Sequence, residues 1–135
     1  MTEEQQKQLA EINLSVNALP YEEAVGAHEP MDWWTDLPVE GQSWGCRDYV
    51  LAKADRLRAL GWAAAGLQVL LCWSEPMGNP PTRNYHAVLA VDTGDSAKMI
   101  LDSRFDEVYQ MDSPPADYVW DRIQVPGGVE FEPVQ

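Results

Sequence analysis

Basic residues are scarce in this 135-residue sequence, which has 9 lysine and arginine residues against 22 aspartate and glutamate residues. The formal net charge at pH 7 is therefore −13. Nucleic acids and anionic membrane surfaces attract proteins through clustered positive charge, so this composition argues against both as partners. The negative charge favours solubility, and it leaves a cationic substrate or partner open.

Cysteines and long apolar runs are also scarce. The two cysteines, Cys46 and Cys72, are too few for a disulfide framework, and Cys72 falls in an aliphatic run that predicts a buried strand. No apolar run is long enough to span a membrane. The polar, acidic residues 1–7 do not read as a secretory signal. We therefore expect a cytoplasmic protein, or a periplasmic one if a leader has been removed.

The length of the chain predicts one domain over residues 1–135. A helix is predicted from residue 2 to about residue 16, with Thr2 and Gln5 in capping-box positions. Residues 17–42 contain prolines and glycines that favour a long irregular segment. The predicted strands are 66–73, 85–91, 97–102, 107–111 and 118–125, followed by an edge strand or a frayed tail.

Cys46 stands at the start of a second predicted helix, which Gly61 is placed to end. The apolar stripe of this helix consists of Val50, Leu51, Ala54, Leu57 and Leu60. The unpaired N–H groups and the positive dipole end of a helix N-terminus stabilise a thiolate, which is the nucleophilic form of cysteine. Cys46 is therefore a candidate nucleophile, with an inert buried thiol as the alternative.

His86 and Asp102 lie on two strands that we expect to form a hairpin through a turn at residues 92–96. If Gly94 is the centre, paired residue numbers sum to 188, as those of His86 and Asp102 do. Directly opposed residues share a face, with Cβ atoms roughly 5 Å apart. The candidate catalytic residues are therefore Cys46 as nucleophile, His86 as proton carrier and Asp102 to orient the imidazole.

Residues near Cys46 are candidates for the rest of a site. The backbone N–H of Cys46 is one candidate oxyanion donor, and Gln42 or the indole of Trp44 is a candidate for the second. Three aromatic residues are candidates for the walls of a substrate groove, with core packing as the alternative: Trp33, Trp34 and Tyr85.

The motif Gly45-Cys46-Arg47-Asp48-Tyr49, followed by Ala52-Lys53, by His86-Ala87-Val88-Leu89 and by Leu101-Asp102, resembles the bacterial transglutaminase-like cysteine peptidases. The resemblance extends from about residue 17 to residue 102. It implies an α+β, papain-like or transglutaminase-like fold, with the cysteine at the N-terminus of a central helix packed on an antiparallel sheet. It also implies a thiol protease without a cofactor, acting on a peptide or isopeptide bond of a protein substrate.

The sequence departs from the family motif, Gly-Asp-Cys-Glu-Asp-Tyr, on both sides of the cysteine, where it has Gly45 and Arg47. In calcium-dependent members, acidic residues at these positions help to bind the ion. Ca²⁺ needs oxygen ligands and is repelled by a cation, so we expect that this calcium site is lost and that no metal is bound. Arg47 would instead help to hold the thiolate.

Two alternatives remain open. One is an amidase or peptidoglycan peptidase of phage type on the same fold. The other is a non-catalytic module that keeps the fold and holds a peptide in a groove lined by tryptophans. If the acceptor is water the reaction is hydrolysis, and if it is an amine the reaction is transamidation; the resemblance favours hydrolysis. The sequence predicts no particular oligomeric state.

Overall fold

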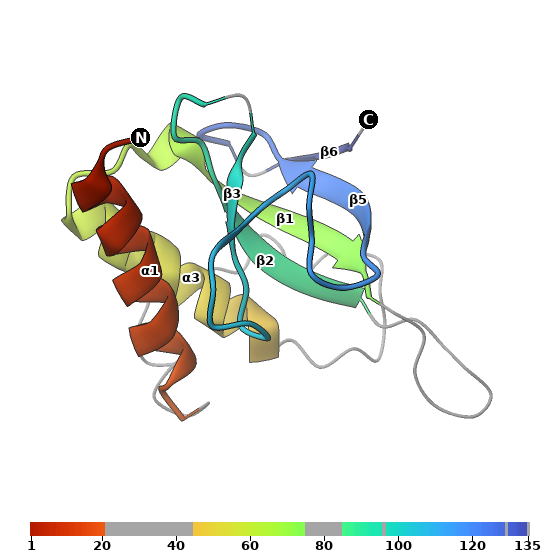
Figure 1. The fold of residues 1–135 in the computed structure, drawn as a ribbon. Coiled ribbons are helices and arrows are strands. Elements are labelled where there is room, and N and C mark those ends of the chain that lie inside the picture. The colour runs from red at the N-terminus through yellow and green to blue at the C-terminus, as the bar shows by residue number, and fades with distance from the viewer. Residues whose placement is uncertain (21–44, 75–84, 96, 129, 135) are drawn as a thin grey trace.

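The described part of the chain consists of two α-helices beside a six-stranded antiparallel sheet (Figure 1). The structure is a computed structural model, and it describes residues 1–20, 45–74, 85–95, 97–128 and 130–134. The helices are α1 (Glu3–Asn17), α3 (Gly45–Ala59) and the short 3-10 helix η1 (Ala64–Gly66). The strands are β1 (Leu67–Trp73), β2 (Tyr85–Val91), β3 (Met99–Leu101), β4 (Tyr109–Gln110), β5 (Val119–Gln124) and β6 (Phe131–Pro133). Their order in the sheet is β4-β3-β2-β1-β5-β6.

Helix α1 begins where the sequence predicts it. The hydroxyl of Thr2 accepts a hydrogen bond from the N–H of Gln5 at 3.1 Å, and the side chain of Gln5 accepts one from the N–H of Thr2 at 2.9 Å. This reciprocal capping box satisfies two N–H groups at the helix start. The buried stripe of α1 consists of Leu9, Asn13 and Val16. Two of these residues are apolar, whereas Asn13 hydrogen-bonds into the loop after β3.

Helix α3 confirms the helix predicted from Cys46, and it ends at Ala59, two residues before Gly61. Gly61 has a φ of +100°, in the left-handed region that glycine adopts without strain. Its N–H donates to the carbonyl of Arg58, and the N–H of Trp62 donates to the carbonyl of Leu57. This pattern is a Schellman motif. Leu60 was wrongly expected in the apolar stripe: it is 50% exposed, because the helix has already ended before it.

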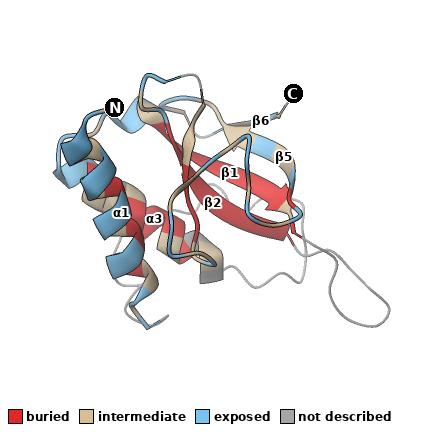
Figure 2. Cartoon of the chain, in the orientation of Figure 1, coloured by how far each residue is buried: buried red, intermediate tan, exposed pale blue. Residues whose placement is uncertain are grey.

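Both faces of the central strands are covered, and β1 and β2 are almost wholly buried (Figure 2). The residues that pack with α1 and α3 are Leu67, Val69, Leu71, Tyr85, Ala87, Leu89 and Val91. The other face packs with side chains of β4, β5 and their neighbours through Leu70, Val88, Ala90 and Ile100. Each fully buried aliphatic side chain contributes about 2 kcal/mol. The β1–β2 pair therefore anchors the fold.

The hairpin of β2 and β3 forms, but the predicted register is wrong. The observed pairs are Leu89 with Leu101, Ala90 with Ile100 and Val91 with Met99, so paired residue numbers sum to 190. The connection between the strands is therefore residues 92–98, centred on Asp95 rather than Gly94, and within it the side chain of Asp92 accepts a hydrogen bond from the N–H of Gly94 at 2.9 Å. Asp102 is therefore diagonal to His86 rather than directly opposite. A difference of two residues keeps both side chains on one face of the sheet.

The strands toward the edges are shorter than predicted, and β4 has two residues where five were expected. Strand β6 confirms the expected edge strand in the tail.

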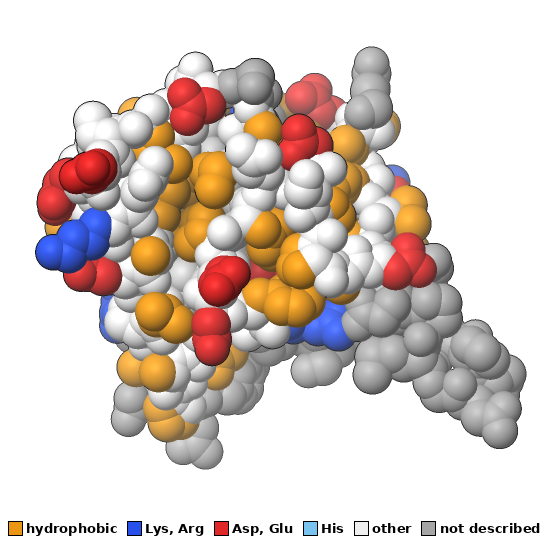
Figure 3. Space-filling view, viewed as in Figure 1, with side chains coloured by type: hydrophobic (Ala, Val, Ile, Leu, Met, Phe, Trp, Pro, Cys, Tyr) orange, Lys and Arg blue, Asp and Glu red, His pale blue; other side chains and the backbone are white. Residues whose placement is uncertain are grey.

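Within the described ranges, no helix is both long and apolar enough to cross a membrane. The face seen in Figure 3 carries more acidic than basic side chains, as the net charge of −13 leads one to expect.

Candidate active site

The three candidate catalytic residues come from three elements that the fold brings together. Cys46 is the second residue of α3 and a half-buried free thiol. His86 is the second residue of β2, and Asp102 directly follows the last residue of β3. Strands β2 and β3 are neighbours in the sheet, and α3 packs against β2. The carboxylate of Asp102 is a hydrogen-bond partner of the His86 imidazole, and the thiol of Cys46 lies close enough to help raise the pKa of His86.

The His86–Asp102 pair is the best-defined part of the site. Nε2 of His86 lies 2.8 Å from Oδ1 of Asp102, and their side chains are 8% and 0% exposed. Burial alone would lower the pKa of His86, but the hydrogen bonds and negative charges of Asp102 and Cys46 raise it to about 9. The imidazole is therefore protonated at neutral pH when both partners are ionised. Because Nε2 faces Asp102, Nδ1 is the ring nitrogen left for Cys46.

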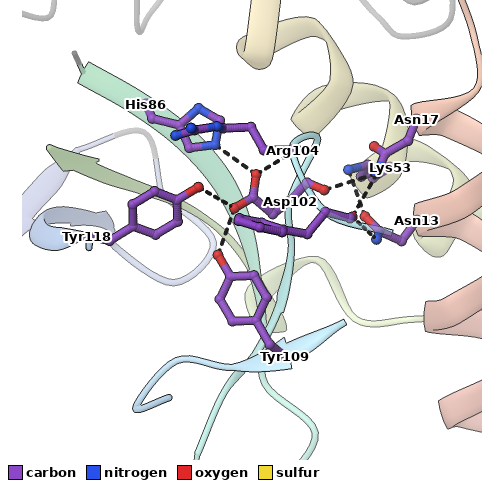
Figure 4. A network of polar contacts seen from close by, with 9 residues as sticks. Asn13, Asn17, Lys53, His86, Asp102, Arg104, Tyr109 and Tyr118 are labelled. Carbon is purple, nitrogen blue, oxygen red and sulfur yellow. Dashed lines mark hydrogen bonds and ion pairs between the residues drawn. The ribbon is translucent and has the colours of Figure 1, made fainter. Parts of the chain in front are cut away.

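The carboxylate of Asp102 accepts four hydrogen bonds (Figure 4). Oδ1 interacts with His86 and with the backbone N–H of Arg104, the latter at 3.0 Å. Oδ2 accepts from the hydroxyls of Tyr109 at 2.8 Å and Tyr118 at 2.9 Å. Burial alone would raise the pKa of Asp102, yet the hydrogen bond and charge of His86 and the other donors lower it overall. Asp102 is thus held as an anion.

Sequence reasoning missed Tyr109 and Tyr118. Burial, followed by the nearby carboxylate of Asp102, raises the pKa of each tyrosine far above its ordinary value, so both hydroxyls stay protonated and donate. The ring of Tyr118 also lies beside the ring of His86, with centroids 5.7 Å apart. No local motif marks these residues. A buried aspartate needs several donors, however, and a search of the predicted neighbouring strands would have found them.

Four predicted site residues, Gln42, Trp44, Trp33 and Trp34, lie outside the described residues, and their roles stay predictions. Tyr85 is buried at 5% exposure in the core beside α3. Its ring packs on Trp73, with centroids 4.6 Å apart, and its hydroxyl donates to Asp121. The structure therefore gives Tyr85 a place in the core, while a role in a groove stays a prediction.

The backbone N–H of Cys46 lies in the first turn of α3. The N–H groups of the first helical turn have no partner within the helix, and Cys46 belongs to that turn. An oxygen next to the Cys46 sulfur is therefore within the field of these dipoles. The geometry is compatible with the oxyanion role predicted for the Cys46 N–H.

The described residues do not fit a calcium site. Among them, no group of three or more His, Cys, Asp or Glu side chains lies close enough to hold a metal ion. Asp48 supplies one buried carboxylate in the first turn of α3. Next to Cys46, Gly45 has no side chain, and Arg47 is a cation whose side chain lies outside the description. Ca²⁺ takes about six to eight oxygen ligands, so this donor set is too poor.

An α+β domain with a cysteine at a helix start and a histidine–aspartate pair on the adjoining sheet defines a papain-like or transglutaminase-like arrangement. A family model described as bacterial transglutaminase-like cysteine proteinase (BTLCP) matches residues 1–127. The chain belongs to this family. The resemblance read from the cysteine, histidine and aspartate motifs is confirmed.

The fold is similar to solved structures of LapG from Legionella pneumophila. The calcium-bound form aligns with a TM-score of 0.60 at 20% identity and covers 87% of this chain and 63% of that chain. The EGTA-treated form aligns with a TM-score of 0.59 at 20% identity, covering 87% and 61%. This chain therefore spans just under two thirds of the length of these structures. A comparison with curated protein sequences gives no match.

Proposed function

We propose that this protein is a cysteine peptidase that hydrolyses a peptide or isopeptide bond in a protein substrate. The observation that carries the proposal is the buried His86–Asp102 pair at 2.8 Å, next to a Cys46 thiol that helps to raise the pKa of His86. Membership of a cysteine proteinase family supports the choice of bond. Cys46, His86 and Asp102 form the triad in this proposal.

The first half of the reaction forms an acyl-enzyme. The thiolate of Cys46 attacks the carbonyl carbon, a C–S bond forms, and an electron pair moves onto the carbonyl oxygen. The N–H of Cys46 stabilises that oxyanion. His86 then gives its proton to the leaving nitrogen, the C–N bond breaks and the amine departs. Asp102 keeps the imidazole oriented and stabilises its positive charge until the proton has moved.

The second half returns the enzyme to its starting state. His86, now neutral, takes a proton from an entering water, whose oxygen attacks the thioester carbon. The C–S bond breaks, the carboxylic acid product leaves and the thiolate re-forms beside the imidazolium. An amine in place of water would give transamidation, and the family relation favours water. The cytoplasmic location expected from the sequence stays a prediction.

A non-catalytic binding module on the same fold is less well supported. A fully buried carboxylate costs several kcal/mol unless it is paired and hydrogen-bonded, and Asp102 has four donors arranged around it. A module that only binds a peptide in a groove would not need four donors around a buried carboxylate that contacts a histidine. Acyl transfer does need it, because the imidazolium must be oriented and stabilised.

Cleavage of a proteome-derived peptide library, read by mass spectrometry, tests the proposal. Cys72 pairs with His86 across the sheet, but its thiol is fully buried and takes no part in the proposed reaction. The wild type and Cys72→Ala should therefore generate the same new amino termini. Cys46→Ala should generate none. An identical peptide pattern with Cys46→Ala, or no new termini with any variant, would contradict a peptidase. Release of peptides from purified peptidoglycan in a parallel reaction would favour the cell-wall amidase instead.

A further inference from the structure

Two asparagines of α1 hold the turn that follows β3. The side-chain amide of Asn13 donates to the carbonyls of Phe105 at 3.0 Å and Asp106 at 2.9 Å. One helical turn later, the amide of Asn17 donates to the carbonyls of Asp102 at 3.0 Å and Phe105 at 3.1 Å. Both side chains reach from α1 toward Asp102 in Figure 4. Helix α1 thus fixes the backbone on which Asp102 is carried.

A lysine connects this arrangement to the helix of Cys46. Lys53 lies on α3 with no exposed surface, and its Nζ donates to Oδ1 of Asn13 at 2.9 Å. It follows Cys46 by seven residues, which is two helical turns, so both lie on the same side of α3 roughly 10 Å apart along the axis. An unbroken series of contacts therefore runs from α3 through Lys53 and Asn13 to the Asp102 turn.

Apolar packing alone does not explain a lysine at this place. A methionine of similar length would fill the volume without desolvating an amine. Burial lowers the pKa of Lys53 to about 7, although the negative charge of Asp102 acts in the opposite direction. The amine donates to Asn13 whether it is charged or neutral. What the lysine adds is direction, because hydrogen bonds fix orientation whereas apolar contacts are non-directional.

We propose that Lys53, Asn13 and Asn17 are positioning residues that hold the turn of Asp102 in register with the helix of Cys46. This inference rests on the proposed function, and it makes α1 part of the active-site framework. We call the three residues the bracket. Disturbing the bracket should let the Asp102 turn move away from His86 and weaken the 2.8 Å contact between them.

The titration of His86, followed by NMR of its ring, tests the bracket without any substrate. The sequence has two histidines, so His28→Gln assigns the signals. We expect a midpoint near 9 in the wild type. In Lys53→Met, Asn13→Ala and Asn17→Ala it should fall by about one pH unit, a tenfold loss of proton affinity. Because Lys53 titrates near 7, Lys53→Met removes little charge at the pH where His86 titrates.

Gln8→Ala is the matched control. The side chain of Gln8 accepts a hydrogen bond from the indole of Trp62 at 2.8 Å, so it also ties α1 to the rest of the fold, but away from the Asp102 turn. Gln8→Ala should leave the His86 midpoint unchanged. If the bracket variants lower the thermal midpoint while His86 titrates as in the wild type, the bracket is merely structural and the proposal is overturned.

The bracket and the proposed peptidase fail in different ways. A wild-type midpoint near 9 that falls in the bracket variants would support the bracket even if no library peptide is cleaved. A wild-type midpoint near the ordinary value of 6.5 would overturn the bracket, because the Asp102 turn would not be held against His86. Lys53→Met is the decisive variant, since replacing a buried amine with an apolar side chain of similar length is expected to preserve folding.

Discussion

The apolar core around β1 and β2 and the polar cluster around Asp102 are built in opposite ways. The core is made from runs of neighbouring aliphatic residues, most of them fully buried. The polar cluster is made from single side chains of α1, α3, β2 and β4 and of the residue before β5. The core holds the elements together, whereas the cluster sets their relative positions to within a hydrogen bond. Stability should therefore depend mainly on the first region and chemistry on the second.

The strongest way to break this division is Asp102→Asn. The asparagine keeps the shape of the side chain, but it carries no charge to stabilise the imidazolium and does not fix the correct tautomer. We expect the rate of peptide hydrolysis to fall about a thousandfold or more. Leu71→Ala, in the apolar core, should instead cost about 2–5 kcal/mol of unfolding free energy and leave the rate per folded molecule unchanged. Denaturation curves combined with initial rates separate the two. Equal rate losses in both variants would contradict the division.

The tyrosines provide a smaller effect of the same kind. Tyr109→Phe and Tyr118→Phe each remove one donor from Oδ2 of Asp102 and leave the ring in place. Each substitution should lower the rate of hydrolysis about tenfold, which corresponds to one lost hydrogen bond to a charged group. The double variant should lose more than either single variant, because Oδ2 would then lack both hydroxyl donors. A double variant as active as the wild type would show that these hydroxyls serve packing alone.

Within the polar cluster, His86 and Lys53 should make the stability of the protein depend on pH in opposite directions. The folded pKa of His86 is raised, so its contribution to stability is fully present below about pH 6.5 and is lost as the pH rises through about 9. The folded pKa of Lys53 is lowered to about 7, so its destabilising effect is largest below pH 7 and fades as the pH rises toward 10.5. Between about pH 7 and pH 9 the two slopes oppose each other.

Lys53→Met removes one of these slopes. In urea denaturation, the unfolding free energy of the variant should fall by up to about 1 kcal/mol between pH 7 and pH 8. That of the wild type should stay nearly level over the same range. A level profile in the variant would mean that His86 does not bind its proton more tightly in the folded protein.

The smallest expected effect is that of calcium. The residues beside Cys46 are glycine and arginine, and the described residues hold no cluster of metal-binding side chains. Addition of Ca²⁺ or of EGTA should therefore change neither the thermal midpoint nor the rate of hydrolysis. A rise of several degrees in the thermal midpoint on adding Ca²⁺ would contradict the predicted loss of the calcium site.

Local patterns in the sequence predicted the elements, because their causes are local. The capping box at Thr2, the left-handed glycine at residue 61 and the bounds of β2 all follow from neighbouring residues. The predicted register of the β2–β3 hairpin was wrong by two residues, because Val91 pairs with Met99 and the connection is centred on Asp95 rather than Gly94. The prediction that His86 and Asp102 lie on the same face of the sheet is still correct, since side chains on a strand alternate with a period of two.

The environment of Asp102 could not be predicted in the same way. Tyr118 lies 16 residues from Asp102 along the chain, and Asn17 lies 85 residues away. No short motif encodes such contacts, because they depend on how separate elements pack. Lys53 was read from the sequence only as part of a family motif, and its full burial appears once α1 is placed beside α3.

An assembled triad is tested most directly by the alkylation rate of Cys46 with iodoacetamide between pH 5 and pH 10. Cys72→Ala provides the background, with and without His86→Ala. We expect alkylation at pH 6 to be faster with His86 in place than in His86→Ala, because a protonated imidazole beside the thiol favours attack by sulfur. A single rise near pH 8.5 in both proteins, typical of a free thiol, would contradict an assembled triad.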